Sequence, residues 1–61
     1  MISIVNINEG WEYEQVIVVT YKVDNKEDKL IIPNHVAKAF KTFPMFFRFI
    51  VATIKTRESM Q

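Results

Sequence analysis

Alternating apolar and polar side chains predict strands in the first half of the chain. Ile2 to Ile7 is rich in β-branched residues, and Glu12 to Val23 alternates with a period of two. One face of the longer segment is apolar except for Gln15, which is typical of a central strand packed against a helix. A third, short strand is expected at Lys29 to Ile32, ending before Pro33 because proline cannot donate to the ladder.

Two polar segments separate the expected strands. Asn8-Glu9-Gly10 contains the only glycine, and we expect a tight turn there because Asn and Gly tolerate positive φ. Asp24 to Asp28 is expected to form the second turn. The simplest architecture is an α+β fold in a single domain, residues 1–61: a small antiparallel three-stranded sheet (β-β-β) followed by a C-terminal helix.

The expected helical segment, Asn34 to Arg57, contains all five phenylalanines and no acid. Pro44 interrupts it, and proline inside a helix removes a hydrogen bond and clashes with the preceding turn. The helix is therefore expected to be kinked or broken at Pro44, into pieces of about 34–42 and 43–57. Asn34 is the expected N-cap of the first piece and Thr42 of the second. Spacings of four and three place an apolar stripe on this helix: Val36, Phe40, Phe43, Phe47, Ile50 and Ile54.

The part of this segment after Pro44 is apolar nearly all round, which predicts burial on several sides. A fourth strand at Phe46 to Lys55 is the alternative, because β-branched and aromatic residues also suit strands. On the helical interpretation a second copy of the chain supplies the extra cover. The residues expected at that homodimer interface are Phe43, Phe46, Phe47, Ile50 and Ile54.

Length and composition point to the same homodimer. A chain of 61 residues buries only about 60% of its unfolded surface, and small domains usually need a disulfide, a metal or a second subunit. With no cysteine and one histidine, a disulfide and a thiolate metal site are excluded, and no cofactor is expected. The chain shows no signal-peptide pattern and no apolar run of the roughly 20 residues that span a bilayer. A cytoplasmic location without a membrane partner is expected.

Charge is distributed unevenly along the chain. Residues 1–28 contain six acids and two lysines, whereas residues 29–57 contain six bases and no acid. The basic half suggests a surface that neutralises phosphates, although a solvated helix face has the same composition. Trp11, beside the first expected turn, is a candidate anchor for a partner. The candidate partner- or nucleic-acid-binding residues are Lys38, Lys41, Arg48, Lys55 and Trp11.

One segment resembles a known family. Lys29 to Phe40 places a short strand, Pro33 and a helix start in succession, and it resembles the strand-proline-helix segment of swapped-hairpin transition-state regulators. Those proteins are dimeric and bind DNA, so the resemblance implies nucleic-acid binding. The arginine expected after the proline is replaced by Ala37 or Lys38, and the Gly-Asp turn and closing strands of the family are missing.

No set of residues in the sequence predicts catalysis or a small-molecule substrate. Glu12 and Glu14 share a strand face, but the chain is too short to build a cleft around a carboxylate pair. We therefore expect a small non-enzymatic binding protein, of the inhibitor, antitoxin or accessory-factor type, that acts by occupying a macromolecular partner. A protein partner is favoured. The alternative is a nucleic-acid-binding regulator that uses the basic helix face.

Overall fold

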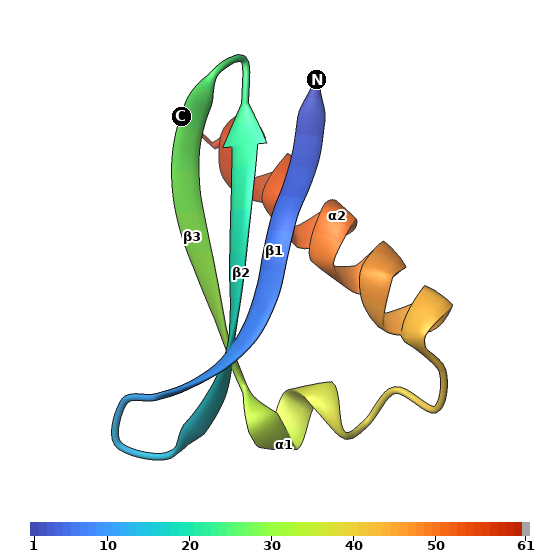
Figure 1. Ribbon diagram of the computed structural model, residues 1–61. Coiled ribbons are helices and arrows are strands. Elements are labelled where there is room, and N and C mark those ends of the chain that lie inside the picture. The colour runs from blue at the N-terminus through green and yellow to red at the C-terminus, as the bar shows by residue number, and fades with distance from the viewer. Residues whose placement is uncertain (61) are drawn as a thin grey trace.

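The computed structural model describes residues 1–60 as one three-stranded antiparallel sheet followed by two helices. The sheet has the order β1-β2-β3, so the longest apolar alternation lies in the central strand, and a C-terminal helix follows (Figure 1). This is the α+β fold predicted from the sequence. The elements are β1 (Ile2–Trp11), β2 (Gln15–Val23), β3 (Lys26–Pro33), α1 (Asn34–Ala37) and α2 (Phe43–Ser59).

The register of the sheet brings the apolar side chains to one face. Ile4 is opposite Tyr21 and Ile7 is opposite Val19. The two isoleucines are three residues apart, and in a regular strand this odd spacing would place them on opposite faces of the sheet. A β-bulge between Ile4 and Asn6 supplies the extra residue, Val5. The bulge therefore allows both isoleucines to face the helix.

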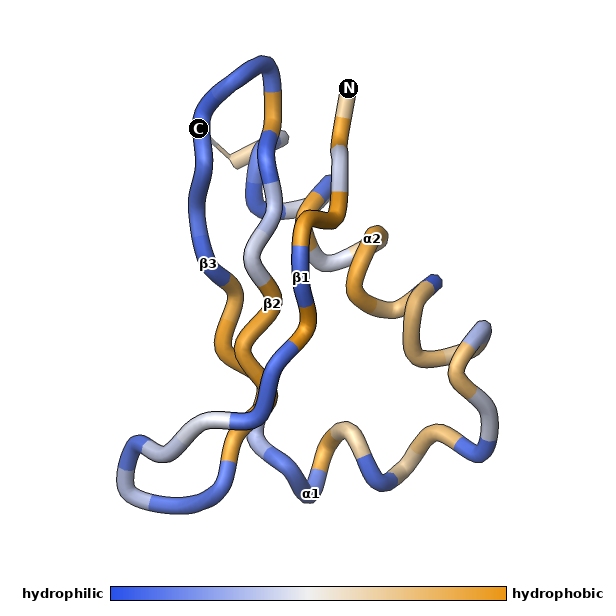
Figure 2. The backbone as a smooth tube through the Cα atoms, viewed as in Figure 1, coloured by the Kyte–Doolittle hydropathy of each residue, from blue (hydrophilic) through white to orange (hydrophobic). Residues whose placement is uncertain are grey.

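The core lies between this face of the sheet and α2. Figure 1 shows α2 behind the sheet, and the face toward the viewer carries no helix. In Figure 2 the apolar residues of β3 lie in its half nearer α1, and most of α2 is apolar. Around the core, half-buried aromatic residues of α2 fill the space toward α1. The buried cluster consists of Val19, Tyr21, Ile32, Ile50 and Ile54.

The first turn is not where the sequence predicted it. Gly10 lies inside β1, opposite Val16, and the chain turns at residues 12–14, so that β2 begins at Gln15 and not at Glu12. A Cβ atom at position 10 would lie 2.9 Å from Cγ2 of Val18. A larger residue at this position would therefore force the Val18 side chain to shift, and no turn involves Gly10.

The second turn is tighter than predicted. Asp24 and Asn25 have φ values of 49° and 70°, and they connect β2 to β3 as a two-residue turn. Positive φ at both central positions matches the twist of the two flanking strands. Because the turn needs only these two residues, Lys26 pairs with Val23 and β3 begins three residues earlier than expected.

The helical segment is broken before Pro44, as one of the two predicted forms required. Thr42 is the N-cap of α2, where its hydroxyl accepts a hydrogen bond from the N–H of Met45 at 3.4 Å, and Pro44 lies in the first turn. Residues 46–55 are helical, which removes the alternative of a fourth strand. The first piece is shorter than expected, because α1 ends at Ala37.

Asn34 is not the N-cap that the sequence predicted. Pro33 occupies that position without a side-chain cap, and Asn34 is the first residue of α1. The Asn34 amide instead donates to Oε1 of Gln15 at 3.3 Å, which connects α1 to the start of β2.

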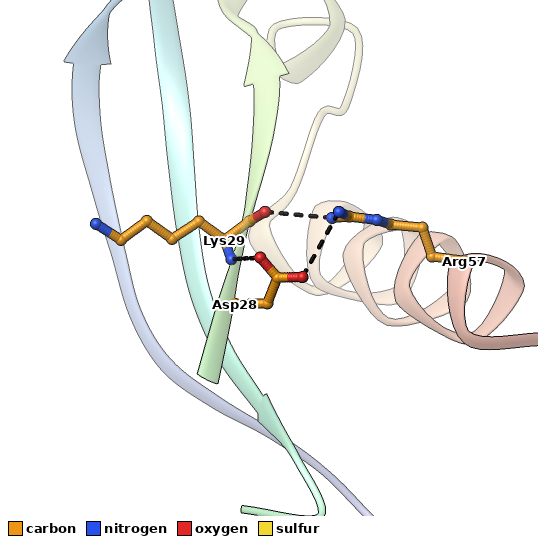
Figure 3. A network of polar contacts seen from close by, with 3 residues as sticks. All are labelled: Asp28, Lys29 and Arg57. Carbon is orange, nitrogen blue, oxygen red and sulfur yellow. Dashed lines mark hydrogen bonds and ion pairs between the residues drawn. The ribbon is translucent and has the colours of Figure 1, made fainter. Parts of the chain in front are cut away.

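Arg57 attaches the C-terminal part of α2 to the edge strand β3. Its guanidinium donates to the carbonyl oxygen of Lys29 at 3.2 Å and lies 3.7 Å from a carboxylate oxygen of Asp28 (Figure 3). Both side chains of this ion pair are partly exposed, and such a pair contributes about 0–1 kcal/mol. The contact therefore orients α2 more than it stabilises the fold.

Candidate functional site

A shallow hollow on α2 combines apolar and basic side chains. It has a volume of about 380 Å³ and lies on the outer surface of the helix. Arg48 and Lys55, seven residues apart, lie two turns from each other along the same side of α2 and border the same hollow. We call this site the α2 hollow. Its lining residues are Phe47, Arg48, Val51, Ala52 and Lys55.

The two bases of the α2 hollow are not neutralised within the described part of the chain. The ion pairs among residues 1–60 involve the N-terminal amine, His35 and Arg57, and neither Arg48 nor Lys55 takes part in one. The lining contains no carboxylate, hydroxyl or imidazole group. It can therefore attract an anionic group and cover an apolar one, and it offers no acid–base pair for catalysis.

A second hollow of similar volume, 370 Å³, lies on α2 and is less suited to a charged partner. Its only basic residue is Arg57, which already contacts Asp28 and the Lys29 carbonyl. The remaining lining is mostly apolar and includes two threonines, Thr53 and Thr56. The α2 hollow is thus the stronger candidate for a binding site.

The predicted basic residues do not all lie on one helix face. Lys38 and Lys41 lie in the connection between α1 and α2, before the helix begins, so the spacing that related them to Arg48 and Lys55 does not apply. All four side chains are exposed. The structure brings together only Arg48 and Lys55, at the α2 hollow. Val51 and Ala52, which complete its lining, were not predicted because nothing in their spacing distinguishes them from core residues.

The aromatic residues of the segment form two groups with different exposure. Phe46 and Phe49 are half-buried and pack against Phe40, with ring centroids 5.6 and 5.0 Å from it. Phe43 and Phe47 form a separate pair at 6.0 Å, and 61% and 38% of their side-chain surfaces are exposed. Because Phe47 also borders the α2 hollow, the exposed pair and the hollow are continuous.

This difference in exposure reduces the number of residues that are available for the predicted homodimer interface. Ile50 and Ile54 are completely buried against the sheet of their own chain, and Phe46 belongs to the intramolecular aromatic cluster. Of the five residues proposed for that interface, only Phe43 and Phe47 are exposed on the surface. The homodimer itself stays a prediction.

The turn between β1 and β2 exposes a second group of aromatic residues. Trp11 is 77% exposed and Tyr13 is fully exposed. Glu12 and Glu14 alternate with them, and the N–H of Glu12 donates to the Glu14 carbonyl at 3.1 Å. We call residues Trp11 to Glu14 the hairpin tip. Trp11 was predicted as a candidate anchor, whereas Glu12, Tyr13 and Glu14 were expected in a strand.

Tyr21 is a buried titratable group beneath the C-terminal part of α2. Its hydroxyl is buried and has no hydrogen-bond partner among the described residues. Burial raises the pKa of this hydroxyl above its ordinary value of 10.0, while the positive charge of Arg57 acts in the opposite direction. Tyr21 is therefore neutral at physiological pH and serves the core.

The described residues contain no metal-binding cluster and no membrane-spanning helix that would add a further site. Within residues 1–60, no group of three or more His, Cys, Asp or Glu side chains is placed to hold a metal ion. None of the helices in this range is long and apolar enough to cross a bilayer. Comparisons with protein-family models, with curated proteins and with solved structures found no match to this chain. The geometry of the exposed surfaces is thus the basis for a functional proposal.

Proposed function

We propose that this chain is a small non-enzymatic binding protein that acts by occupying an acidic surface of a protein partner. The observation that carries the proposal is the α2 hollow, where an exposed aromatic pair adjoins two bases that form no ion pair within residues 1–60. Contiguous apolar surface bordered by polar groups is typical of protein interaction sites. Aromatic and arginine side chains also contribute most strongly to binding energy at such sites.

The composition of the hollow favours a protein over a nucleic acid as the partner. Val51, Ala52 and Phe47 give it an apolar lining, which a protein partner can cover with its own apolar side chains. Nucleic-acid affinity depends instead on many phosphate contacts, about 6–10 in well-studied cases. The hollow presents two bases, and Lys38 and Lys41 lie on a separate segment.

A site-specific cross-linking experiment tests this proposal. A photoreactive phenylalanine analogue replaces Phe47, and the protein is irradiated in a nuclease-treated lysate of its host. We expect one dominant protein adduct. The adduct should disappear when Arg48→Glu and Lys55→Glu are added, because both attractive charges then repel an acidic partner.

The matched control carries the same photoreactive group at Val5, which is exposed in β1. This control is expected to give no such adduct. Equal adducts from both positions, or an adduct that survives the two charge reversals, would show that the α2 hollow is not the binding site. Binding of a labelled duplex at about 50 mM salt, lost on reversal of the same charges, would favour the nucleic-acid alternative.

A further inference from the structure

The hairpin tip and the α2 hollow have opposite charge and complementary apolar content. The tip presents two aromatic rings, and Glu9 in β1 adds to the two acids within it. The α2 hollow presents one aromatic ring, two small apolar side chains and two bases that no carboxylate of the described residues pairs with. An arginine or lysine over a tryptophan face gains a cation–π interaction in addition to charge attraction. The protein therefore exposes an acidic aromatic surface and a basic apolar one, whose charges are complementary.

The hairpin tip is held in place by contacts at its base. The Asn34 amide donates to Gln15 directly after the tip, and Nδ1 of His35 lies 3.9 Å from a carboxylate oxygen of Glu14. The backbone hydrogen bond between Glu12 and Glu14 closes the turn itself. A recognition loop that is ordered before binding loses less conformational entropy when it binds. These contacts order the base and the turn of the tip, from which Trp11 is exposed.

The tip and the hollow of one chain do not meet. Figure 1 shows the turn between β1 and β2 projecting from one end of the sheet, on the side away from the N-terminal half of α2. A contact between them has to join two copies. If the tip of each copy occupies the hollow of the other, the two contacts are equivalent and the assembly closes as a dimer.

We infer that the free protein forms this reciprocal homodimer, with the hairpin tip of each copy seated in the α2 hollow of the other. A dimer with α2 against α2 would bring Arg48 and Lys55 of both copies together, and the like charges would oppose it. The reciprocal arrangement pairs acids with bases and covers Trp11 and Phe47. It rests on the proposed function in one respect: the dimer covers the surface that the partner needs, so partner binding and self-association compete.

Trp11 provides a direct readout because it is the only tryptophan. As protein concentration rises, we expect light scattering to show the mass doubling from 7.2 kDa. Over the same range the tryptophan emission should shift to shorter wavelength, and iodide quenching should decrease. A mass that stays at 7.2 kDa at millimolar concentration, or a dimer that forms without a change in Trp11 emission, contradicts the inference.

A charge exchange identifies the two surfaces in contact. The tip-reversed variant carries Glu12→Lys and Glu14→Lys, and the hollow-reversed variant carries Arg48→Glu and Lys55→Glu. Each alone should be monomeric, because its tip and hollow then have the same sign. An equimolar mixture should restore the dimer, because both contacts in the mixed pair join opposite charges. A mixture that remains monomeric, or a single variant that dimerises as well as the parent protein, contradicts the inference.

The control for total charge reverses Lys22 and Lys29, which are exposed in β2 and β3, to glutamate. This variant has the same net charge as the hollow-reversed one and should dimerise as the parent does. Far-ultraviolet circular dichroism of all variants confirms that each is folded.

The two proposals fail separately. A host-protein adduct at Phe47 together with a monomeric free protein would refute the reciprocal dimer and leave the proposed function standing. A dimer that obeys the charge exchange, without any host adduct when the tip-reversed variant is used for cross-linking, would support self-association and refute the proposed function.

Discussion

Two parts of α2 carry side chains of the same kind in different surroundings. Ile50 and Ile54 are completely buried, whereas Phe43 and Phe47, at positions of the same apolar stripe, are exposed. The 17 residues of α2 extend over about 25 Å, but the outer strands of a three-stranded sheet are only about 10 Å apart. In Figure 1 the helix crosses the sheet obliquely, and its N-terminal end lies beyond β1.

The exposed phenylalanines follow from this mismatch of lengths. A helix that crosses a narrow sheet at an angle is covered only where strands lie beneath it. The apolar residues beyond the edge, Phe43 and Phe47, are only partly covered, although they continue the periodicity of the core. Apolar surface of this kind is available for another molecule to cover, and at α2 it adjoins the bases of the α2 hollow.

The largest expected difference between the two parts of α2 is in the stability lost when one side chain of each is truncated. Ile54→Ala removes a completely buried side chain, and we expect it to lower the free energy of unfolding by about 2–5 kcal/mol. A domain of this size has a total stability of only about 3–9 kcal/mol, so the variant should be partly unfolded. Phe43→Ala should change it by no more than about 0.5 kcal/mol. Urea unfolding followed by circular dichroism measures both.

Equal losses for Ile54→Ala and Phe43→Ala would mean that Phe43 is packed as a core residue. The conclusion that the N-terminal end of α2 extends beyond the sheet would then be wrong. The apolar part of the proposed binding surface would also be wrong. A loss for Phe43→Ala that appears only at high protein concentration would instead show that a second copy covers it.

How far the sequence could predict this structure depends on the range of the interactions involved. Thr42 and Pro44 were predicted correctly as the start of α2, because capping and the first turn depend on neighbouring residues. The separation of the stripe into core and surface could not be predicted, because it depends on the width of the sheet and the direction in which α2 crosses it. The same holds for the dimer interface expected at Ile50 and Ile54.

The errors in the strands have a similar cause. Gly10 was assigned to a turn on its own conformational freedom, but it lies inside β1, where a side chain would press on Val18 of the neighbouring strand. Asp24 and Asn25 were included in a turn of five residues, although a two-residue turn with positive φ suffices. The basic residues of the candidate site were assigned to one face on the assumption of a continuous helix. The break before Thr42 removes Lys38 and Lys41 from that face.

The exposed end of α2 is stabilised by the Thr42 cap, and removing this cap should have a smaller effect on stability. Thr42→Ala removes the hydroxyl that accepts from the Met45 N–H, and we expect a loss of about 1 kcal/mol of stability. Thr56→Ala is the matched control, because Thr56 lies exposed inside α2 and alanine favours helix there. The control should be neutral or slightly stabilising. If Thr42→Ala were equally neutral, the N-terminal end of α2 would be frayed and could not present Phe43 and Phe47 in a fixed geometry.

Tyr21 lies in β2 beneath the covered part of α2, and its ionisation is expected to affect stability only at high pH. Burial raises the pKa of Tyr21 above 10.0, so folding favours its neutral form. Its contribution to stability is fully present below pH 10.0, the ordinary value of the unfolded chain, and is lost as the pH rises from there through the folded pKa. The loss amounts to at most roughly 1.4 kcal/mol per pH unit for one proton.

Tyr21→Phe should remove this alkaline loss and leave the fold intact. At neutral pH the variant should match the parent or exceed it by up to about 1 kcal/mol, because a buried hydroxyl without a partner is costly. Tyr13→Phe changes an exposed side chain and serves as the control, which should keep the parent's alkaline loss. Thermal unfolding between neutral pH and pH 11 measures all three proteins. A clear loss of stability for Tyr21→Phe at neutral pH would contradict this and would show that the hydroxyl is hydrogen-bonded, with Arg57, whose charge acts on it, as the candidate partner.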